Sequence, residues 1–312
     1  MRRDHSSGAA SWAVALIAAF ILSTHASAAS LKDLLDGRSA MQAYQNGNDV
    51  RVRDLSTGKD RKLFTRAGST REPWTGGINR DGTKLCCTDG DRVCVIDLDG
   101  SNHQLVTPAG GSNGYFWRDD DGNDWVVYTG EPEHKDQSGT TWRVRIDAKT
   151  NKPIESSRRK IADQQYSAGL GGSGVYLFES YGKSYILNLK TGRKSVHLND
   201  KQNCVGSANP GDQPWMMYEE SPAHHDVVIS EWNERANSAR YIWRYHHKSG
   251  EVFARWSTTD SRYATISKNG EKLYLVRVKV DTRGSGDNTG SWTEAPMGIS
   301  KYVGGVWIGD DD

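Results

Sequence analysis

Short hydrophobic runs recur along this chain at intervals of roughly 40 to 50 residues, and each follows a polar turn built on Asp or Gly. The runs are AMQAYQ, KLCCTDG, DWVVYTG, VYLFES, PWMMYEE and RYATIS. The turns that introduce them are Asp36-Gly37, Asp81-Gly82, Asp121-Gly122, Gly171-Gly172, Gly211-Asp212 and Asp260-Ser261. A repeat of this length, built from strands and turns, is typical of a β-propeller in which one repeat forms one blade of four strands.

A second strand-like segment follows each of the first four runs, with alternating apolar and polar residues. These segments are VRVRDLSTG, VCVIDLDG, WRVRIDAKTN and SYILNLKTG. Alternation is the pattern of a half-buried strand, and the closing Thr-Gly, Asp-Gly or Thr-Asn suits a tight turn. Further short strands, such as RKLF and HQLV, come next. We therefore predict an all-β fold, a six-bladed β-propeller of four-stranded blades over residues 36–308.

Two segments near the C-terminus are expected to form a closing strand and a loop. The segment YVGGVWIG, residues 302–309, has the composition of a strand. We expect it to return to the N-terminal blade or to complete the last one, because either pairing removes the open edge of the ring. Residues 281–296 are rich in Gly, Asp, Asn and Ser and show little alternation, which predicts a mobile loop inside the last blade.

One repeat resembles those of the TolB-type propellers. It spans Trp74 to Thr107 and reads WTGGINRDGTKLCCTDGDRVCVIDLDGSNHQLVT, with an Asp-Gly turn and a strand ending in Asp-Leu-Asp-Gly. WSTTDSRYATI, Trp256 to Ile266, is similar to the start of another repeat. The resemblance covers most of residues 36–280 and implies an exported bacterial propeller. The third repeat departs from it with a loop at 131–139, and the fifth uses VVISEWN and ARYIWRYHH as outer strands.

The first 29 residues have the pattern of a signal peptide. Arg2 and Arg3 precede an apolar run from Trp12 to Leu22, and Ala26-Ser27-Ala28 matches a cleavage site. The run is short for a membrane span, although an uncleaved anchor is the alternative. We expect cleavage after Ala28 or Ala29, which gives a secreted or periplasmic chain over residues 30–312. That chain would be a single propeller domain and a monomer without a membrane span.

The charge balance and the cysteines narrow the expected binding partners and disulfides. Of 40 basic and 39 acidic residues, removal of Arg2, Arg3 and Asp4 leaves 38 of each, so nucleic acid is not an expected partner. The four cysteines are Cys86, Cys87, Cys94 and Cys204. With a hairpin turn at Asp89-Gly90, Cys94 would lie diagonal to Cys87, an awkward geometry for a disulfide. We interpret these cysteines as small buried hydrophobes, and a disulfide to Cys204 stays open because neighbouring blades approach each other.

Catalytic and metal motifs are sparse in the sequence. It contains no Gly-x-Ser-x-Gly nucleophile elbow, no P-loop and no Cys-x-x-Cys zinc spacing. The acidic run 119–124 occupies a repeat turn and lacks the full calcium-loop pattern. The pairs His224-His225 and His246-His247 cannot each chelate one ion from a strand, because neighbouring side chains point to opposite faces. Exported propellers resembling the oligogalacturonate lyases do bind a metal through several histidines, which implies an alternative enzymatic function.

Tryptophans are frequent near the expected blade strands: Trp74, Trp117, Trp215, Trp232, Trp243 and Trp256. Most such residues pack between blades. The pairs Trp117-Arg118 and Arg255-Trp256 also precede repeat turns, where an inner strand reaches one mouth of the central channel. With Trp74 they form the candidate binding site, in which indoles stack on a ligand and solvated arginines hold a carboxylate. The arginines could instead pair with Asp119 or Asp260.

These observations favour an exported, non-catalytic binding module for a protein or glycan, without a cofactor or metal. The alternative is a metal-dependent, lyase-like enzyme that acts on acidic polysaccharides. The enzyme requires several His, Asp or Glu side chains that converge on one mouth of the channel. The binding module requires an accessible patch at that mouth.

Overall fold

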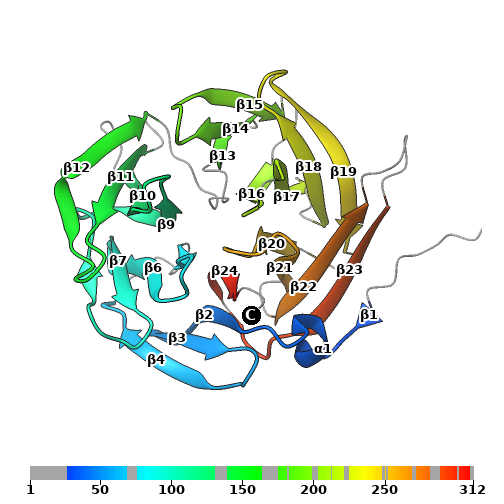
Figure 1. Cartoon of the computed structure of the whole chain (residues 1–312), viewed down its shortest axis with the longest axis horizontal. Helices are drawn as coiled ribbons and strands as arrows, with labels where there is room; N and C mark the ends of the chain where they lie inside the picture. The colour runs from blue at the N-terminus through cyan, green and yellow to red at the C-terminus, as the bar shows by residue number, and fades with distance from the viewer. Residues whose placement is uncertain are drawn as a thin grey trace, which may run out of the picture.

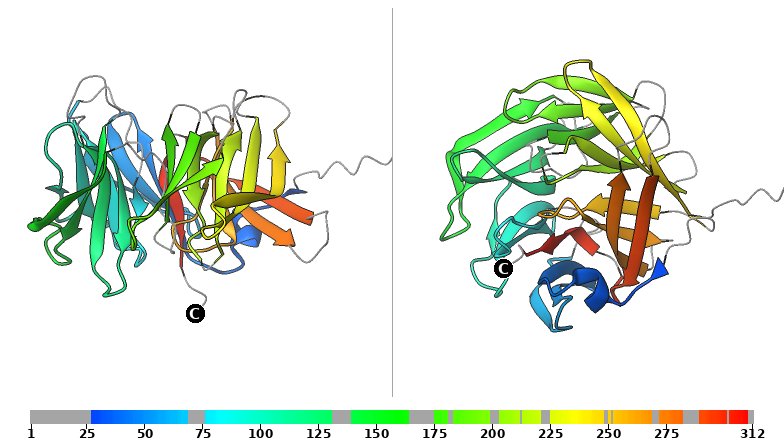
Figure 2. Two further views of the ribbon diagram at one scale, coloured as in Figure 1. Left: turned by 90° about the horizontal axis from the view of Figure 1, so that it is seen from above. Right: turned by 45° about the vertical axis from the view of Figure 1, so that its right-hand side comes forward.

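The computed structural model describes residues 27–68, 76–130, 139–163, 175–180, 183–198, 203–211, 213–220, 225–247, 250, 252–268, 272–281, 289–300 and 302–309. Within these ranges, six β-sheets stand in chain order around a common centre (Figure 1). Seen from the side, the sheets stand upright next to one another as the walls of a ring (Figure 2). We number them as sheets 1 to 6 along the chain, starting with the sheet that contains β2.

The strands of each sheet follow in spatial order. Sheet 1 contains β24 (Tyr302–Ile308), β2 (Ala40–Asn46), β3 (Asp49–Asp54) and β4 (Asp60–Thr65). Sheet 2 contains β5 (Gly77–Ile78), β6 (Lys84–Asp89), β7 (Arg92–Asp97) and β8 (Gln104–Leu105). Sheet 3 contains β9 (Ser112–Arg118), β10 (Asp124–Gly130), β11 (Thr140–Ile146) and β12 (Pro153–Ala162).

The second half of the ring continues the pattern. Sheet 4 contains β13 (Val175–Ser180), β14 (Lys183–Asn188) and β15 (Lys194–Leu198). Sheet 5 contains β16 (Asn203–Ala208), β17 (Trp215–Glu220), β18 (Asp226–Asn233) and β19 (Ser238–His246). Sheet 6 contains β20 (Val252–Trp256), β21 (Tyr263–Lys268), β22 (Lys272–Asp281), β23 (Thr289–Pro296) and the short parallel strand β1 (Ser27–Ala28).

The hydrophobic runs of the sequence lie where the repeat predicts. Five of the six fall on strands next to an innermost one, namely β2, β6, β10, β17 and β21, and the sixth falls on β13. The alternating segments that follow them form β3, β7, β11 and β14. The prediction of an all-β propeller with four-stranded blades is confirmed.

Sheet 4 differs from its neighbours because three of its strands lie in the described residues. Its first strand, β13, packs against β16 in the same way as β6 packs against β9 and β17 against β20. This contact gives β13 the second position in its blade. Residues 164–174, which precede β13 and correspond in sequence to an innermost strand, lie outside the described residues. The count of six complete blades therefore stays a prediction.

The ring closes by pairing the two ends of the propeller. Strand β24 is antiparallel to β2 and becomes the innermost strand of sheet 1, as one of the two expected arrangements had it. Gly304 of β24 lies so close to the next inner strand that a Cβ there would be 2.3 Å from the Cα of Gly77. Gly304 also has φ +68°, which favours glycine. Two glycines thus let the first and last parts of the propeller meet.

The core lies between neighbouring sheets. On β6, Leu85 and Cys87 face a cluster shared with sheet 1, whereas Cys86 faces a cluster shared with sheet 3. This division follows from strand geometry, because successive side chains point to opposite faces. Sheets 2, 5 and 6 bury both of their faces here, so their strands β6, β17 and β21 are buried at nearly every position.

A short helix, α1 (Leu31–Leu35), precedes the first blade, and the repeat pattern did not predict it. Ser30 caps its start by accepting a hydrogen bond from the Asp33 amide, and Asp36 ends it in a left-handed conformation. The turn at Asp36-Gly37, which we assigned to the repeat, is therefore the C-terminal cap of this helix. Among the described residues, no helix is long and apolar enough to cross a membrane.

The prediction of a mobile loop at 281–296 is wrong for the C-terminal half of that segment. Residues 289–296 form β23, which pairs with β22 along its length. Trp292 is 5% exposed and stacks on Trp243 and Tyr245, with ring centroids 5.8 and 4.6 Å apart. This aromatic packing and the strand pairing outweigh the loop-like composition. Residues 282–288 lie outside the described residues.

The predicted register around the cysteines is also wrong. Asp89 pairs with Arg92, so the two-residue turn is Gly90-Asp91, and Gly90 has φ +61°. Cys87 therefore lies directly opposite Cys94 instead of diagonal to it. Cys204 lies on β16 in sheet 5, whose neighbours in the ring are sheets 4 and 6. Sheet 2 is not one of these neighbours, so the approach of neighbouring blades does not support the disulfide to Cys204 that the sequence left open.

Candidate functional site

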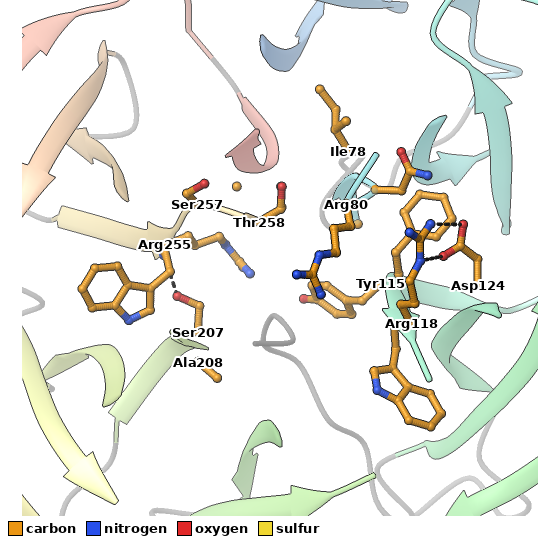
Figure 3. Close-up of a pocket in the computed structure, with 17 residues that line it drawn as sticks. Ile78, Arg80, Tyr115, Arg118, Asp124, Ser207, Ala208, Arg255, Ser257 and Thr258 are labelled. Atoms are coloured by element: carbon orange, nitrogen blue, oxygen red, sulfur yellow. Dashed lines mark hydrogen bonds and ion pairs between the residues drawn. The ribbon is translucent and has the colours of Figure 1, made fainter. Parts of the chain in front are cut away.

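The C-terminal ends of the innermost strands define one small cavity at the centre of the ring. Strands β9, β16 and β20, together with the residues after β5, surround a volume of about 90 Å³ (Figure 3). These ends meet because the innermost strand of each blade leads into a repeat turn on the same side of the propeller. A volume of this size admits several water molecules or one small chemical group, since one water needs roughly 10–15 Å³.

Arg118, at the end of β9, lines the cavity but is held by two carboxylates. Its guanidinium donates to both oxygens of Asp81 at 2.6 and 2.5 Å, and its Nε lies 2.8 Å from Asp124. The Arg118 hydrogen bonds keep the pKa of Asp81 below its usual range. Asp81 comes from the repeat turn of sheet 2, so this pair fixes the guanidinium between sheets 2 and 3. The charge of Arg118 is largely compensated within the protein.

Arg80 is the exposed cation of the cavity. It precedes Asp81 in the same turn, and its side chain makes no ion pair with any residue of the described ranges. Its backbone carbonyl accepts a hydrogen bond of 3.0 Å from the indole of Trp307 on β24. That indole also packs on Gly82, where a Cβ would lie 2.6 Å from the ring. The closing strand thus holds the turn that carries Arg80.

Arg255 approaches the same space from the opposite side. It lies on β20 and is 4% exposed, and Figure 3 shows its side chain and that of Arg80 directed toward each other. Two guanidinium groups directed into one small cavity repel each other, and an anion between them removes that repulsion. Among the described residues, the charged side chains that line the cavity are Arg80, Arg118, Arg255 and Asp124, and Asp81 lies beside it.

Burial changes the interpretation of the predicted site residues. We expected solvated arginines at the channel rim, but Arg118 is ion-paired and Arg255 is buried. The partners of Arg118 are Asp81 and Asp124, not Asp119; Asp260 pairs with Arg38 and Arg262. Removal of Arg118 and Arg255 would therefore disturb the fold as well as any binding.

The predicted tryptophans lie at the cavity but pack into the core. Trp117 is 7% exposed and Trp256 is 2% exposed. The guanidinium of Arg143 lies 5.0 Å from the centre of the Trp117 ring, and Trp125 packs beside it at 6.0 Å. These indoles have no exposed face on which a ligand could stack, so they form part of the cavity wall. Trp74 lies outside the described residues.

Arg80 was not among the predicted site residues, although the sequence carries a signal for it. The rule that selected Arg118 and Arg255 was an arginine just before a repeat turn. Arg80 satisfies the same rule, because it directly precedes the turn Asp81-Gly82. It lacks an adjacent tryptophan, and the pattern of Arg-Trp pairs therefore did not include it.

The other candidate ligand groups lie elsewhere. In the acidic run, Asp119 accepts from the Asn123 amide and from the Trp125 indole, which makes it part of a turn. His246 lies 2.5 Å from Asp226 at the outer edge of sheet 5. Across the ranges that the structure describes, no three His, Cys, Asp or Glu side chains are placed to hold a metal ion.

Comparison with known proteins identifies the fold. No protein-family model matches this chain, and no curated protein sequence does. A putative TolB from Agrobacterium tumefaciens is similar in structure, with a TM-score of 0.52 and 12% identity over 88% of this chain and 99% of that chain. A chain of a mitotic checkpoint complex has a TM-score of 0.50 and 12% identity over 76% and 83%. At such identities the similarity establishes a β-propeller fold and nothing further.

An oligogalacturonate lyase in complex with manganese is more distant in structure. Its TM-score is 0.46 with 15% identity, over 73% of this chain and 68% of that chain. This level of similarity supports no statement about catalysis.

Proposed function

We propose that this chain is an exported, non-catalytic propeller that binds a protein or glycan by accepting an acidic group of the ligand in the central cavity. The observation that carries the proposal is the pair Arg80 and Arg255, directed toward each other in a space of about 90 Å³. Export rests on the leader over residues 1–29, and the mature protein would be a monomeric six-bladed propeller over residues 30–312.

The chemistry of the cavity suits a carboxylate. A guanidinium offers several N–H donors in a planar fork, which matches the two oxygens of a carboxylate. The low-dielectric walls formed by Trp117 and Trp256 strengthen such an interaction relative to water. Because the cavity is small, one acidic group enters it and the rest of the ligand lies on the rim. The cavity thus recognises the charge, whereas the rim selects the ligand.

The first test varies the charge of the ligand. Oligogalacturonate and a short glutamate peptide are titrated by calorimetry, each beside its neutral counterpart, the methyl ester and the glutamine peptide. We expect binding of at least one acidic probe and a loss of roughly 10- to 100-fold for its neutral counterpart, since a hydrogen bond to a charged group contributes about 1.5–3 kcal/mol. Equal affinity for an acidic probe and its neutral form would contradict the proposal, and so would chelator-sensitive cleavage of the oligogalacturonate.

Neutralising Asp81 is expected to tighten binding. In Asp81→Asn, Arg118 keeps Asp124 but loses one compensating charge, so the cavity becomes more positive. We expect affinity for the acidic probe to rise by about two- to fivefold. Asp81 is half exposed, so stability should fall by less than about 1 kcal/mol. Titration and thermal melting measure both effects, and weaker binding with an unchanged melting temperature would show that Asp81 helps to hold the ligand.

A further inference from the structure

Two cysteines face each other across a hairpin of sheet 2, away from the central cavity. Cys87 on β6 and Cys94 on β7 are direct cross-strand partners, and their Sγ atoms are 3.5 Å apart. Directly opposite residues in an antiparallel pair have Cα atoms about 4.5–5.5 Å apart, which lies inside the range of disulfides. The sulfurs need to approach by about 1.5 Å to reach the bond length of roughly 2.05 Å.

The third cysteine of the hairpin, Cys86, is excluded because it points to the opposite face of the strand. Cys87 and Cys94 belong to the cluster between sheets 1 and 2, where both are completely buried. Cys86 points to the other face, where it packs with Val93 and Val95 toward sheet 3. Its cross-strand partner is Val95, so it cannot replace Cys87. The hairpin therefore selects one pair among its own three cysteines.

We propose that Cys87 and Cys94 form a disulfide that clamps the β6–β7 hairpin when the chain folds in the presence of an external disulfide. One cysteine thiolate attacks a sulfur of the external disulfide and releases one thiol, which leaves a mixed disulfide. The second cysteine attacks the protein sulfur of that intermediate and releases the second thiol. The two protein thiols lose two electrons and two protons, and the external disulfide is reduced to two thiols.

Burial determines when the bond forms. The hydrogen bond with Cys87 and burial raise the pKa of the Cys94 thiol well above its ordinary value, and the nearby His103 opposes them only in part. The thiolate is the attacking species, so the folded, reduced hairpin reacts slowly. The bond therefore forms before sheet 1 covers the hairpin. The same burial then shields the disulfide from reductants.

Trypsin gives a direct test, because it cuts after Lys84 and Arg92 and so separates the two strands. Cys86 and Cys87 fall in the peptide 85–92, and Cys94 falls in the peptide 93–118. The denatured, reduced full chain is refolded with glutathione disulfide, alkylated and mapped by mass spectrometry without reductant. We expect peptides 85–92 and 93–118 to be linked. Protein that is folded first and then given the same oxidant should form the link at least tenfold more slowly.

Single variants identify the partner within the first peptide. In Cys86→Ser the link should persist, and in Cys87→Ser and Cys94→Ser it should disappear. The oxidised wild-type protein should melt roughly 5–10 °C above its reduced form, whereas Cys87→Ser should not respond to reductant. The proposal fails if Cys87 and Cys94 are alkylated after oxidative refolding. It also fails if the link depends on Cys86, or if native mass spectrometry shows a metal ion on the thiols instead of a bond.

Discussion

Replacement of Gly304 by Ala is expected to lower the free energy of unfolding by about 3–5 kcal/mol, because it combines backbone strain with a steric clash. The residue has φ +68°, and the added methyl group would lie 2.3 Å from the Cα and N of Gly77. Both atoms belong to the backbone of the neighbouring inner strand, so no side chain can move aside. Strand β24 would then lose its place between β2 and β5, and the ring would open where its ends meet.

Gly122→Ala is the matched control for this experiment. Gly122 also has a positive φ of +80°, but no atom lies within 4 Å of the position that its added methyl group would take. The control therefore measures backbone strain alone, about 1–2 kcal/mol. In a protein of this size the melting temperature falls by about 2–4 °C for each kcal/mol of lost stability. Gly304→Ala should therefore melt roughly 10 °C below the wild type, and Gly122→Ala only a few degrees below it. Equal melting temperatures for the two variants would show that the contact of Gly304 with Gly77 does not hold the ring.

The repeat made most of the fold predictable from the sequence. Apart from β24 in sheet 1 and β1 in sheet 6, the sheets are built from hairpins between strands close in sequence, and the turn residues and alternation that specify them are local. One failure occurred where distant residues decide the structure. Trp292 lies in a segment of loop-like composition, but Trp243, which is about fifty residues earlier, supplies its stacking partner. The helix α1 is five residues long and too short for a periodic signal.

The candidate site was predictable in its position but not in its electrostatics. Arginines beside repeat turns pointed to Arg118 and Arg255, because innermost strands end at one mouth of the ring. Their burial and pairing could not be inferred, since Asp81 and Arg118 come from different sheets and are 37 residues apart. Which arginine is available to a ligand therefore depends on how neighbouring blades meet. The structure favours Arg80, which the sequence analysis did not select.

In the proposed function, Arg80 holds the acidic group of the ligand. Arg80 is exposed and makes no ion pair among the described residues, so its removal should leave the melting temperature within a few degrees of the wild type. Arg193→Ala is the control, because Arg193 is an exposed arginine in the turn between β14 and β15, on the outer part of sheet 4. Both variants change the net charge equally.

Calorimetric titration of these two variants with the acidic probe that the wild type binds is the most direct measurement. We predict that Arg80→Ala lowers affinity by about 10- to 100-fold, whereas Arg193→Ala changes it by less than about twofold. Arg80→Lys should recover part of the loss, since it restores the charge without the planar fork. Wild-type affinity in a folded Arg80→Ala variant, or an equal loss in both alanine variants, would contradict recognition of the ligand in the central cavity.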